Sequence, residues 1–467
     1  MVVYLFILFK MEKLEKEGKE DKNDMGNWTL QYVAAASASL ANFSTGIVFG
    51  WPSQISDELM QGKLDFPINS DDLGWICSSS SIGAALLALF IGSLCDKIGR
   101  KITMLLLIGV FEIGWVLIIL SNSVWMLILG RFMTGMAGGS YCVTVSMYIG
   151  EIARKEVRGV LGSLVQFMIS CGILFTNVAG AYLSIRSLSI ACAALPILFG
   201  FAFFSMPETP FYLLRKGRIE ESKESLRKFL GKHYVDTEYE DLRLHLKCDT
   251  SEKQSTVSVF KKRSVKKACV LGVGLALVKV LTGIDSVTSY LSHIFGKTDI
   301  ELGAQNASII FAVFEVFSVV PQALLVDRLG RKVLLVVTQI VMGLCLGVTA
   351  LSIAIESENA VVQYIPVVAL CLFVVGFSVG IGPIGWIITA EIFEEKIKGR
   401  AMSVCTFLIW ILAFVSVKLF VVFEDLWNIS VPLYVYSVIS LAGAFFILFY
   451  VPETKNKSFE EIEKELS

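Results

Sequence analysis

The sequence carries little charge and shows no excess of either sign. Charged residues make up 18% of its 467 residues, and 41 Lys and Arg are balanced by 42 Asp and Glu. This balance gives no reason to expect a nucleic-acid partner. The ten cysteines lack the paired short spacing of a metal centre, and most lie in apolar runs, where a thiol acts as a small hydrophobic group. We therefore expect neither a metal nor a cofactor.

Apolar residues dominate instead. Hydrophobic residues make up 55% of the chain, and the mean hydropathy is +0.67. This is more apolar surface than a soluble core can bury, so the sequence predicts a lipid bilayer as its surroundings. About 20 apolar residues are needed to cross about 30 Å of hydrocarbon. Twelve stretches are long enough: 29–51, 72–94, 102–121, 124–148, 159–183, 188–206, 266–291, 302–326, 333–355, 361–391, 400–422 and 429–451.

Three short charged motifs occur twice, in the same order, between the apolar stretches. The second copy of each follows the first by roughly 240 residues. The pairs are Asp96-Lys97-Ile98-Gly99-Arg100-Lys101 with Asp327-Arg328-Leu329-Gly330-Arg331-Lys332, Glu151 with Glu391, and Pro207-Glu208-Thr209 with Pro452-Glu453-Thr454. The repetition indicates a duplicated unit. Because the copies run in the same direction, a membrane protein built this way has two halves related by an axis along the membrane normal.

Together these patterns predict an all-α membrane protein with twelve transmembrane helices in two six-helix halves. Basic residues concentrate in the loops that carry the motifs, so these loops, the linker between the halves and both termini are expected on the cytoplasmic side. The linker's charges recur on helical spacing, which favours amphipathic helices at the membrane surface. The predicted segments are an N-terminal segment 1–28, halves 29–206 and 266–451, a linker 207–265 and a tail 452–467.

The ordered motifs resemble those of the sugar porter family of the major facilitator superfamily, and most closely those of the insect facilitated trehalose transporters. The resemblance extends over nearly the whole chain. Besides the repeated motifs, it is carried by Gly92-Ser93-Leu94-Cys95-Asp96, Gly130-Arg131-Phe132, Gln166 followed by Gly172-Ile173-Leu174, Gly283-Ile284-Asp285 and Gly382-Pro383-Ile384-Gly385-Trp386.

The resemblance implies a monomeric transporter of the plasma membrane, and not an enzyme, that carries a small sugar by alternating access. Trehalose, a hexose or a related polyol is the implied substrate. Where proton-coupled members carry a titrating aspartate in the first span, this chain has Ser44, whose hydroxyl does not titrate near neutral pH. The sequence therefore favours a facilitator. A proton-coupled symporter and a sensor that binds sugar without transporting it are the alternatives.

The resemblance assigns four residues to sugar binding. Gln166 matches a sugar-binding glutamine, and Tyr290 matches a tyrosine of the outer gate. Trp386 and Trp410 match tryptophans that cover the sugar. Such a mixture suits a sugar, because its hydroxyls need hydrogen bonds and its C–H faces pack on aromatic rings. The alternatives are a hydrogen bond between helices for the amide, and packing in the core or against lipid for the rings.

Three ionisable residues stand in or near the implied cavity, where the family usually carries amides. Lys279 with Val280 replaces two glutamines, and Asp285 replaces an asparagine. Glu315 falls at a position that is often a polar amide. An ionisable group inside a span is costly, so a paired or functional role is expected. Lys279 can pair with Asp285 or Glu315; alternatively, the cluster binds a charged or unusual polyhydroxy ligand, or carries a proton.

The repeated loops place carboxylates beside bases, which, given the resemblance, suits a cytoplasmic gate. The set is Asp96, Arg100, Glu151 and Arg158 in the first half, and Asp327, Arg331, Glu391 and Lys398 in the second. Their ion pairs are expected to form in the outward-open state and to break in the inward-open state, because a few kcal/mol bias a two-state equilibrium. Alternatively, the bases only set the topology, which leaves the recurring carboxylates without an explanation.

Overall fold

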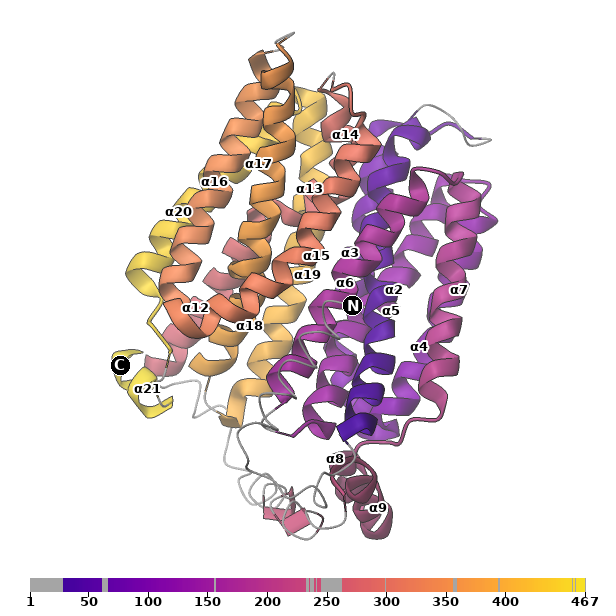
Figure 1. Ribbon diagram of the computed structural model, residues 1–467, viewed down its shortest axis with the longest axis vertical. Coiled ribbons are helices and arrows are strands. Elements are labelled where there is room, and N and C mark those ends of the chain that lie inside the picture. The colour runs from indigo at the N-terminus through magenta and orange to yellow at the C-terminus, as the bar shows by residue number, and fades with distance from the viewer. Residues whose placement is uncertain are drawn as a thin grey trace.

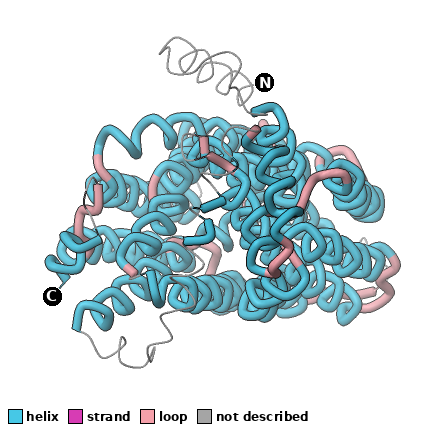
Figure 2. Tube along the Cα trace, turned by 90° about the horizontal axis from the view of Figure 1, so that it is seen from below, coloured by secondary structure: helices cyan, strands magenta, loops and turns pink. Residues whose placement is uncertain are grey.

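The structure, a computed structural model, describes residues 28–60, 66–154, 157–231, 235, 239–240, 242–244, 263–298, 300–355, 359–393, 395–455, 457 and 459–466. Within these residues every regular element is a helix, as predicted (Figures 1 and 2). The predicted N-terminal segment 1–28 lies outside the described residues except for Trp28. Residues 245–262 of the predicted linker lie outside them as well.

The first half is a bundle of six long helices. They are α2 (Trp28–Met60), α3 (Ser70–Ile98), α4 (Arg100–Ile119), α5 (Val124–Ile152), α6 (Arg158–Gly180) and α7 (Ile185–Phe204). Polar caps fix where some of them begin. At the start of α3, the Asn69 side chain accepts a hydrogen bond from the Asp72 backbone N–H, and the Asp72 carboxylate accepts one from the Asn69 N–H. This reciprocal pair satisfies two backbone donors that the helix itself leaves free.

The second half repeats the bundle with two interrupted spans. Its helices are α12 (Arg263–Leu281), α13 (Ile284–Ser289), α14 (Leu291–Gly296), α15 (Ala304–Leu329), α16 (Arg331–Ile355), α17 (Ala360–Val379), α18 (Ile381–Ile392), α19 (Glu395–Leu426) and α20 (Ser430–Tyr450). The break before α13 falls at Gly283, which adopts φ 82° and packs so closely on the Tyr436 ring that a Cβ would clash with it. The break before α18 falls at Gly380, where a Cβ would overlap Thr338.

The helices suit a bilayer in length and in surface. Within the described residues, ten helical segments are long and apolar enough to cross a membrane, with α12–α13 and α17–α18 each counted as one. Helices α5 and α15 complete the predicted two sets of six. Large apolar side chains point outward from the bundle, such as Phe201, which is 76% exposed, and Phe449, which is 72% exposed. A surface of this kind indicates contact with lipid.

The two halves stand side by side (Figure 1). Short helices α8 (Pro210–Arg215), α9 (Ile219–Leu230) and α21 (Phe459–Leu466) lie at one end of the bundle, which we call the linker end; the opposite end is the far end. Across the boundary between the halves, α3 packs on α19, α6 packs on α15, and α2 packs on α13 and α14. These three contact zones determine which predicted residues can meet.

Candidate binding site between the two halves

A carboxyl group joins the halves near the middle of the helices. Glu315 on α15 is only 6% exposed, and its Oε1 accepts a hydrogen bond of 3.0 Å from the Ser170 hydroxyl on α6. Gln166 lies half-buried on α6, one turn before Ser170, so the two side chains share a helix face. The predicted amide and the predicted acid, which come from different halves, are therefore brought to the same region.

Lys279 does not form either predicted ion pair among the described residues. Its Nζ donates a hydrogen bond of 3.1 Å to the Gly382 carbonyl and lies 4.6 Å from the centre of the Trp386 ring. Both partners belong to α18, just after the break at Gly380. The ammonium therefore rests on the aromatic face that the sequence assigns to a sugar, and it is held there by a cation–π contact.

Aromatic rings extend the contact across the boundary. The Trp410 ring on α19 lies 5.6 Å from the Phe49 ring on α2, centre to centre. Sequence analysis did not single out Phe49 or Ser170, because neither type of residue is unusual in a membrane helix. Phe49 adds an apolar surface to the first half opposite the predicted tryptophan.

Tyr290 lies inside the second half and has little surface to offer a ligand in this conformation. The side chain is 1% exposed, its hydroxyl donates to the Val417 carbonyl at 3.3 Å, and its ring stacks 4.9 Å from the Phe420 ring. Tyr290 thus ties the junction of α13 and α14 to α19. Asp285 is half-buried in the first turn of α13, directly after the break at Gly283.

The first-half motif forms a buried ion pair at the linker end. The Arg100 side chain, 2% exposed, contacts Glu151 Oε1 at 2.9 Å and Asp96 Oδ1 at 3.2 Å. Asp96 also pairs with Arg215 of α8 at 2.7 Å. Arg158 is exposed and donates to the Ala153 carbonyl in its own loop at 3.3 Å. These contacts brace the helices of one half.

The second-half motif repeats this pair in a more open setting. Arg331 contacts Glu391 Oε2 at 2.6 Å and the Thr454 hydroxyl at 3.1 Å, with its side chain 21% exposed. The side chains of Asp327 and Lys398 lie outside the described part of the structure. Both central pairs, Arg100 with Glu151 and Arg331 with Glu391, stay within one half, so in this conformation neither joins the halves.

Two further carboxylates cap helices at the linker end. Glu208 accepts hydrogen bonds from the backbone N–H groups of Arg100 and Lys101, and Glu453 accepts them from those of Arg331 and Lys332. Each acid therefore caps the N-terminus of α4 or α16, where a negative charge is favourable. The repeated Pro-Glu-Thr motif was the signal for these residues, but the sequence did not assign them a role.

Their surroundings give the two capping acids different pKa values. Burial raises the pKa of Glu208 above its ordinary value despite the backbone donors. Burial also acts on Glu453 in the same direction, but the backbone N–H groups of Lys455, Lys332, Arg331 and Thr454 outweigh it and lower the pKa.

An ion pair joins the halves at the far end. Lys418 of α19 contacts Asp71 of α3, with 2.5 Å from Nζ to Oδ1 and 2.9 Å from Nζ to the backbone carbonyl. The ammonium also lies 4.9 Å from the centre of the Trp75 ring. Gly74 leaves room for this approach, because a Cβ there would stand 3.1 Å from Nζ. The partners are 347 residues apart, and sequence analysis did not connect them.

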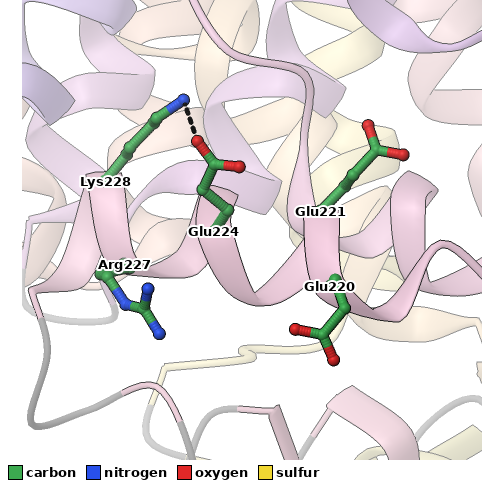
Figure 3. A pocket seen from close by; sticks show the side chains of 5 residues that line it. All are labelled: Glu220, Glu221, Glu224, Arg227 and Lys228. Atoms are coloured by element: carbon green, nitrogen blue, oxygen red, sulfur yellow. Dashed lines mark ion pairs between the residues drawn. The ribbon is translucent and has the colours of Figure 1, made fainter.

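A charged hollow on the outer surface of α9 is separate from these contacts. Figure 3 shows the residues that line it, which are Glu220, Glu221, Glu224, Arg227 and Lys228. Lys228 and Glu224 form an ion pair of 2.7 Å one helical turn apart. The pattern is that of a solvated helix face, as predicted for the linker.

Comparisons with known proteins agree with the fold and the motifs. A family described as "Sugar (and other) transporter" matches residues 15–466. A facilitated trehalose transporter from Bombyx mori is 32% identical in sequence, and the match covers 94% of this chain and 87% of the relative. A facilitated trehalose transporter from Polypedilum vanderplanki is 30% identical, and that match covers 93% of this chain and 88% of the relative. The xylose transporter XylE from E. coli, in a partially occluded inward-open conformation, shares the fold with a TM-score of 0.79 and 21% identity. That match covers 92% of this chain and 100% of XylE.

Proposed function

The chain belongs to the family of sugar and other transporters, and from that membership we propose that it carries trehalose, a hexose or a related polyol across the membrane by facilitated, alternating access. The observation that carries the proposal is the meeting of polar and aromatic groups from both halves near the middle of the helices. Ser170 meets Glu315 there, and Phe49 meets Trp410. A site built from both halves opens to opposite sides in turn as the halves rock.

In this proposal each predicted site residue has a physical task. The Gln166 amide donates to and accepts from sugar hydroxyls, while Trp386 and Trp410 offer rings to the C–H faces. Lys279, Asp285 and Glu315 replace the missing amides of the second half. Tyr290 closes the junction of α13 and α14 on the outer side. A sugar that reaches Trp386 must displace Lys279 from the ring, or bind against both.

The proposed orientation places the linker end in the cytoplasm of a plasma-membrane protein, with both termini on that side and one chain as the working unit. The contact between Asp71 and Lys418 then closes the extracellular end, which makes this conformation inward-facing. In this state the central pairs of the proposed cytoplasmic gate, Arg100 with Glu151 and Arg331 with Glu391, brace each half. The gate motifs, to which Asp327 and Lys398 also belong, approach the other half when the linker end closes.

A facilitator fits the first span better than a symporter. Ser44 is fully buried, and its hydroxyl contacts the Leu40 carbonyl at 3.5 Å, so this position holds no group that titrates near neutral pH. Downhill movement of sugar requires no such group. A sensor would bind the same sugar without moving it, and flux separates the two functions.

The test is uptake of labelled trehalose, glucose and polyols into proteoliposomes, with and without a proton gradient. We expect uptake of at least one of these solutes down its own gradient, with no accumulation when a proton gradient is imposed. Accumulation driven by the proton gradient would show a symporter. Binding without flux would show a sensor, and either result would contradict the proposal.

A further inference from the structure

The Glu315 carboxyl group has only one described hydrogen-bond donor. Its Oε1 accepts from the Ser170 hydroxyl at 3.0 Å. Its Oε2 is buried and has no hydrogen-bond partner among the described residues, and the side chain as a whole is 94% buried, given its exposure of 6%. An ionised carboxylate in such a place would leave half of its charge without a donor, which is costly in a membrane interior.

Among the described residues, the helices that pack most extensively on α15 supply no cation to this carboxyl group. These helices are α6, α14, α16 and α17. Helix α6 presents Ser170 and the thiol of Cys171 near the carboxyl group, while Arg158 at its first position donates to the Ala153 carbonyl at the linker end. The described part of α17 carries no charged residue. His293 of α14 is paired with Glu424 at 2.7 Å, and Arg331 of α16 with Glu391. Lys332, also on α16, lies at the linker end beside Glu453.

A neutral carboxylic acid needs neither a cation nor a second hydrogen-bond donor, and it has the hydrogen-bonding pattern of an amide. It carries one acceptor oxygen and one O–H donor, whereas a carboxylate only accepts. The bonded oxygen of Glu315, Oε1, contacts Ser170, which shares a face of α6 with Gln166, and Oε2 of the same carboxyl group has no partner among the described residues. Building on the proposed function, we propose that Glu315 works as a neutral acid, whose O–H donor and C=O acceptor hold sugar hydroxyls opposite Gln166 in place of an amide.

If Glu315 binds sugar as a neutral acid, sugar affinity must depend on pH in one direction. Ionisation removes the O–H donor and releases its proton to water on the open side, so sugar affinity should fall as pH rises. The proton otherwise stays on Glu315 throughout the cycle, because the O–H is part of the binding site. Glu315 is thus a specificity residue in a facilitator and moves no net charge with the sugar.

The experiment measures sugar exchange by the full chain in proteoliposomes with equal pH on both sides, from about pH 6 to about pH 9, a range that includes documented pKa values of buried glutamates. For the wild type, the apparent KM should rise by up to about tenfold per pH unit once the acid ionises. Glu315→Gln should keep the low-pH KM within about threefold and lose the pH dependence. Glu112→Gln is the matched control, because Glu112 lies on α4, which packs on α5 and α7, and it should keep the wild-type profile.

Ser170→Ala gives an independent test if Glu315→Gln fails to fold. The Ser170 hydroxyl donates to the carboxyl and favours its ionised form, so its removal should move the rise in KM to higher pH. A wild-type pH profile in Glu315→Gln, an unmoved profile in Ser170→Ala, or a sugar-driven proton flux lost in Glu315→Gln would overturn the inference. Absence of exchange by the wild type at every pH would instead overturn the proposed function.

Discussion

The two halves carry the same motifs at the linker end but bury them to different degrees. The Arg100 side chain is 2% exposed, whereas that of Arg331 is 21% exposed, although both pair with a glutamate in the corresponding helix. The capping acids differ in the same way, with a raised pKa at Glu208 and a lowered one at Glu453. A duplicated sequence can thus keep its geometry and still acquire different electrostatics, because burial sets the cost of each charge.

The middle of the helices shows a second difference between the halves. The first half offers Gln166 and Ser170 from α6, which are neutral polar groups. The second half offers Lys279 and Glu315, which are ionisable. The motifs that brace the helices are therefore similar in both halves, while the groups proposed to meet the cargo are not.

Removal of Arg100 should have the largest effect on stability. Arg100→Ala leaves Glu151 buried without its counterion, so we expect a loss of about 3–5 kcal/mol in the free energy of unfolding. Arg331→Ala should cost only about 0.5–1 kcal/mol, because water reaches Glu391 more easily. Unfolding of both variants in detergent micelles checks this. Equal losses would show that the difference in burial has no energetic consequence.

Lys279→Gln should replace an ionisable group of the second half by a neutral amide of the kind that the first half offers. Loss of the ammonium frees the Trp386 ring and supplies an amide, so we expect affinity for neutral sugars to rise by about tenfold, which corresponds to about 1.4 kcal/mol. Competition by unlabelled sugars against labelled uptake measures the change. Unaltered preference and pH dependence would show that Lys279 has only a structural task.

Lys418→Met should loosen the contact between the halves at the far end. The variant loses the pair with Asp71 and the contact with Trp75, so the outward-facing fraction should rise by about fivefold. Distances between spin labels on the first turn of α3 and the last turn of α19 report the shift. Lys464→Met, in the tail helix α21, is the control. An unchanged distance distribution in Lys418→Met would count against an extracellular closure.

The smallest expected effect concerns the two capping acids, Glu208 and Glu453, whose pKa values folding shifts in opposite directions. Because folding lowers the pKa of Glu453, its stabilisation is present above the ordinary value of 4.5 and is lost as pH falls through the lowered pKa. Folding raises the pKa of Glu208, so its contribution is present below 4.5 and is lost as pH rises through the raised pKa.

At pH 7, Glu453→Gln should therefore destabilise the protein by about 0.5 kcal/mol, whereas Glu208→Gln should leave it unchanged or slightly more stable. Unfolding of both variants at pH 7 and near pH 4 gives the comparison. The two variants should converge at the lower pH. A loss of the same sign and size in both at pH 7 would be inconsistent with opposite pKa shifts.

The helical class, the two sets of six spans and the ends that carry the charged motifs could be predicted from the sequence, because apolar length and repetition are local properties. The breaks at Gly283 and Gly380 could not, because they depend on the approach of Tyr436 and Thr338 from other helices. Predicted spans 266–291 and 361–391 are correct in extent but do not reveal these interruptions.

At the candidate site, contacts between residues far apart in the sequence could not be predicted. The sequence singled out Lys279 and Glu315 as unusual ions, but it could not show that Lys279 rests on Trp386 or that Glu315 meets Ser170. The resemblance matched Tyr290 to a tyrosine of the outer gate; in this conformation its ring packs on Phe420, and the gate role stays a prediction. The substrate roles of these residues stay predictions until transport is measured.

Counterflow tests the central claim most directly. Proteoliposomes that contain the full chain are loaded with unlabelled trehalose, glucose or a polyol at equal pH on both sides, and entry of the labelled solute is followed. The account predicts a transient accumulation of label for at least one solute, kept in Glu112→Gln and reduced about tenfold or more in Trp386→Ala. Binding of the solute with no transient accumulation, or accumulation only under an imposed proton gradient, would contradict it.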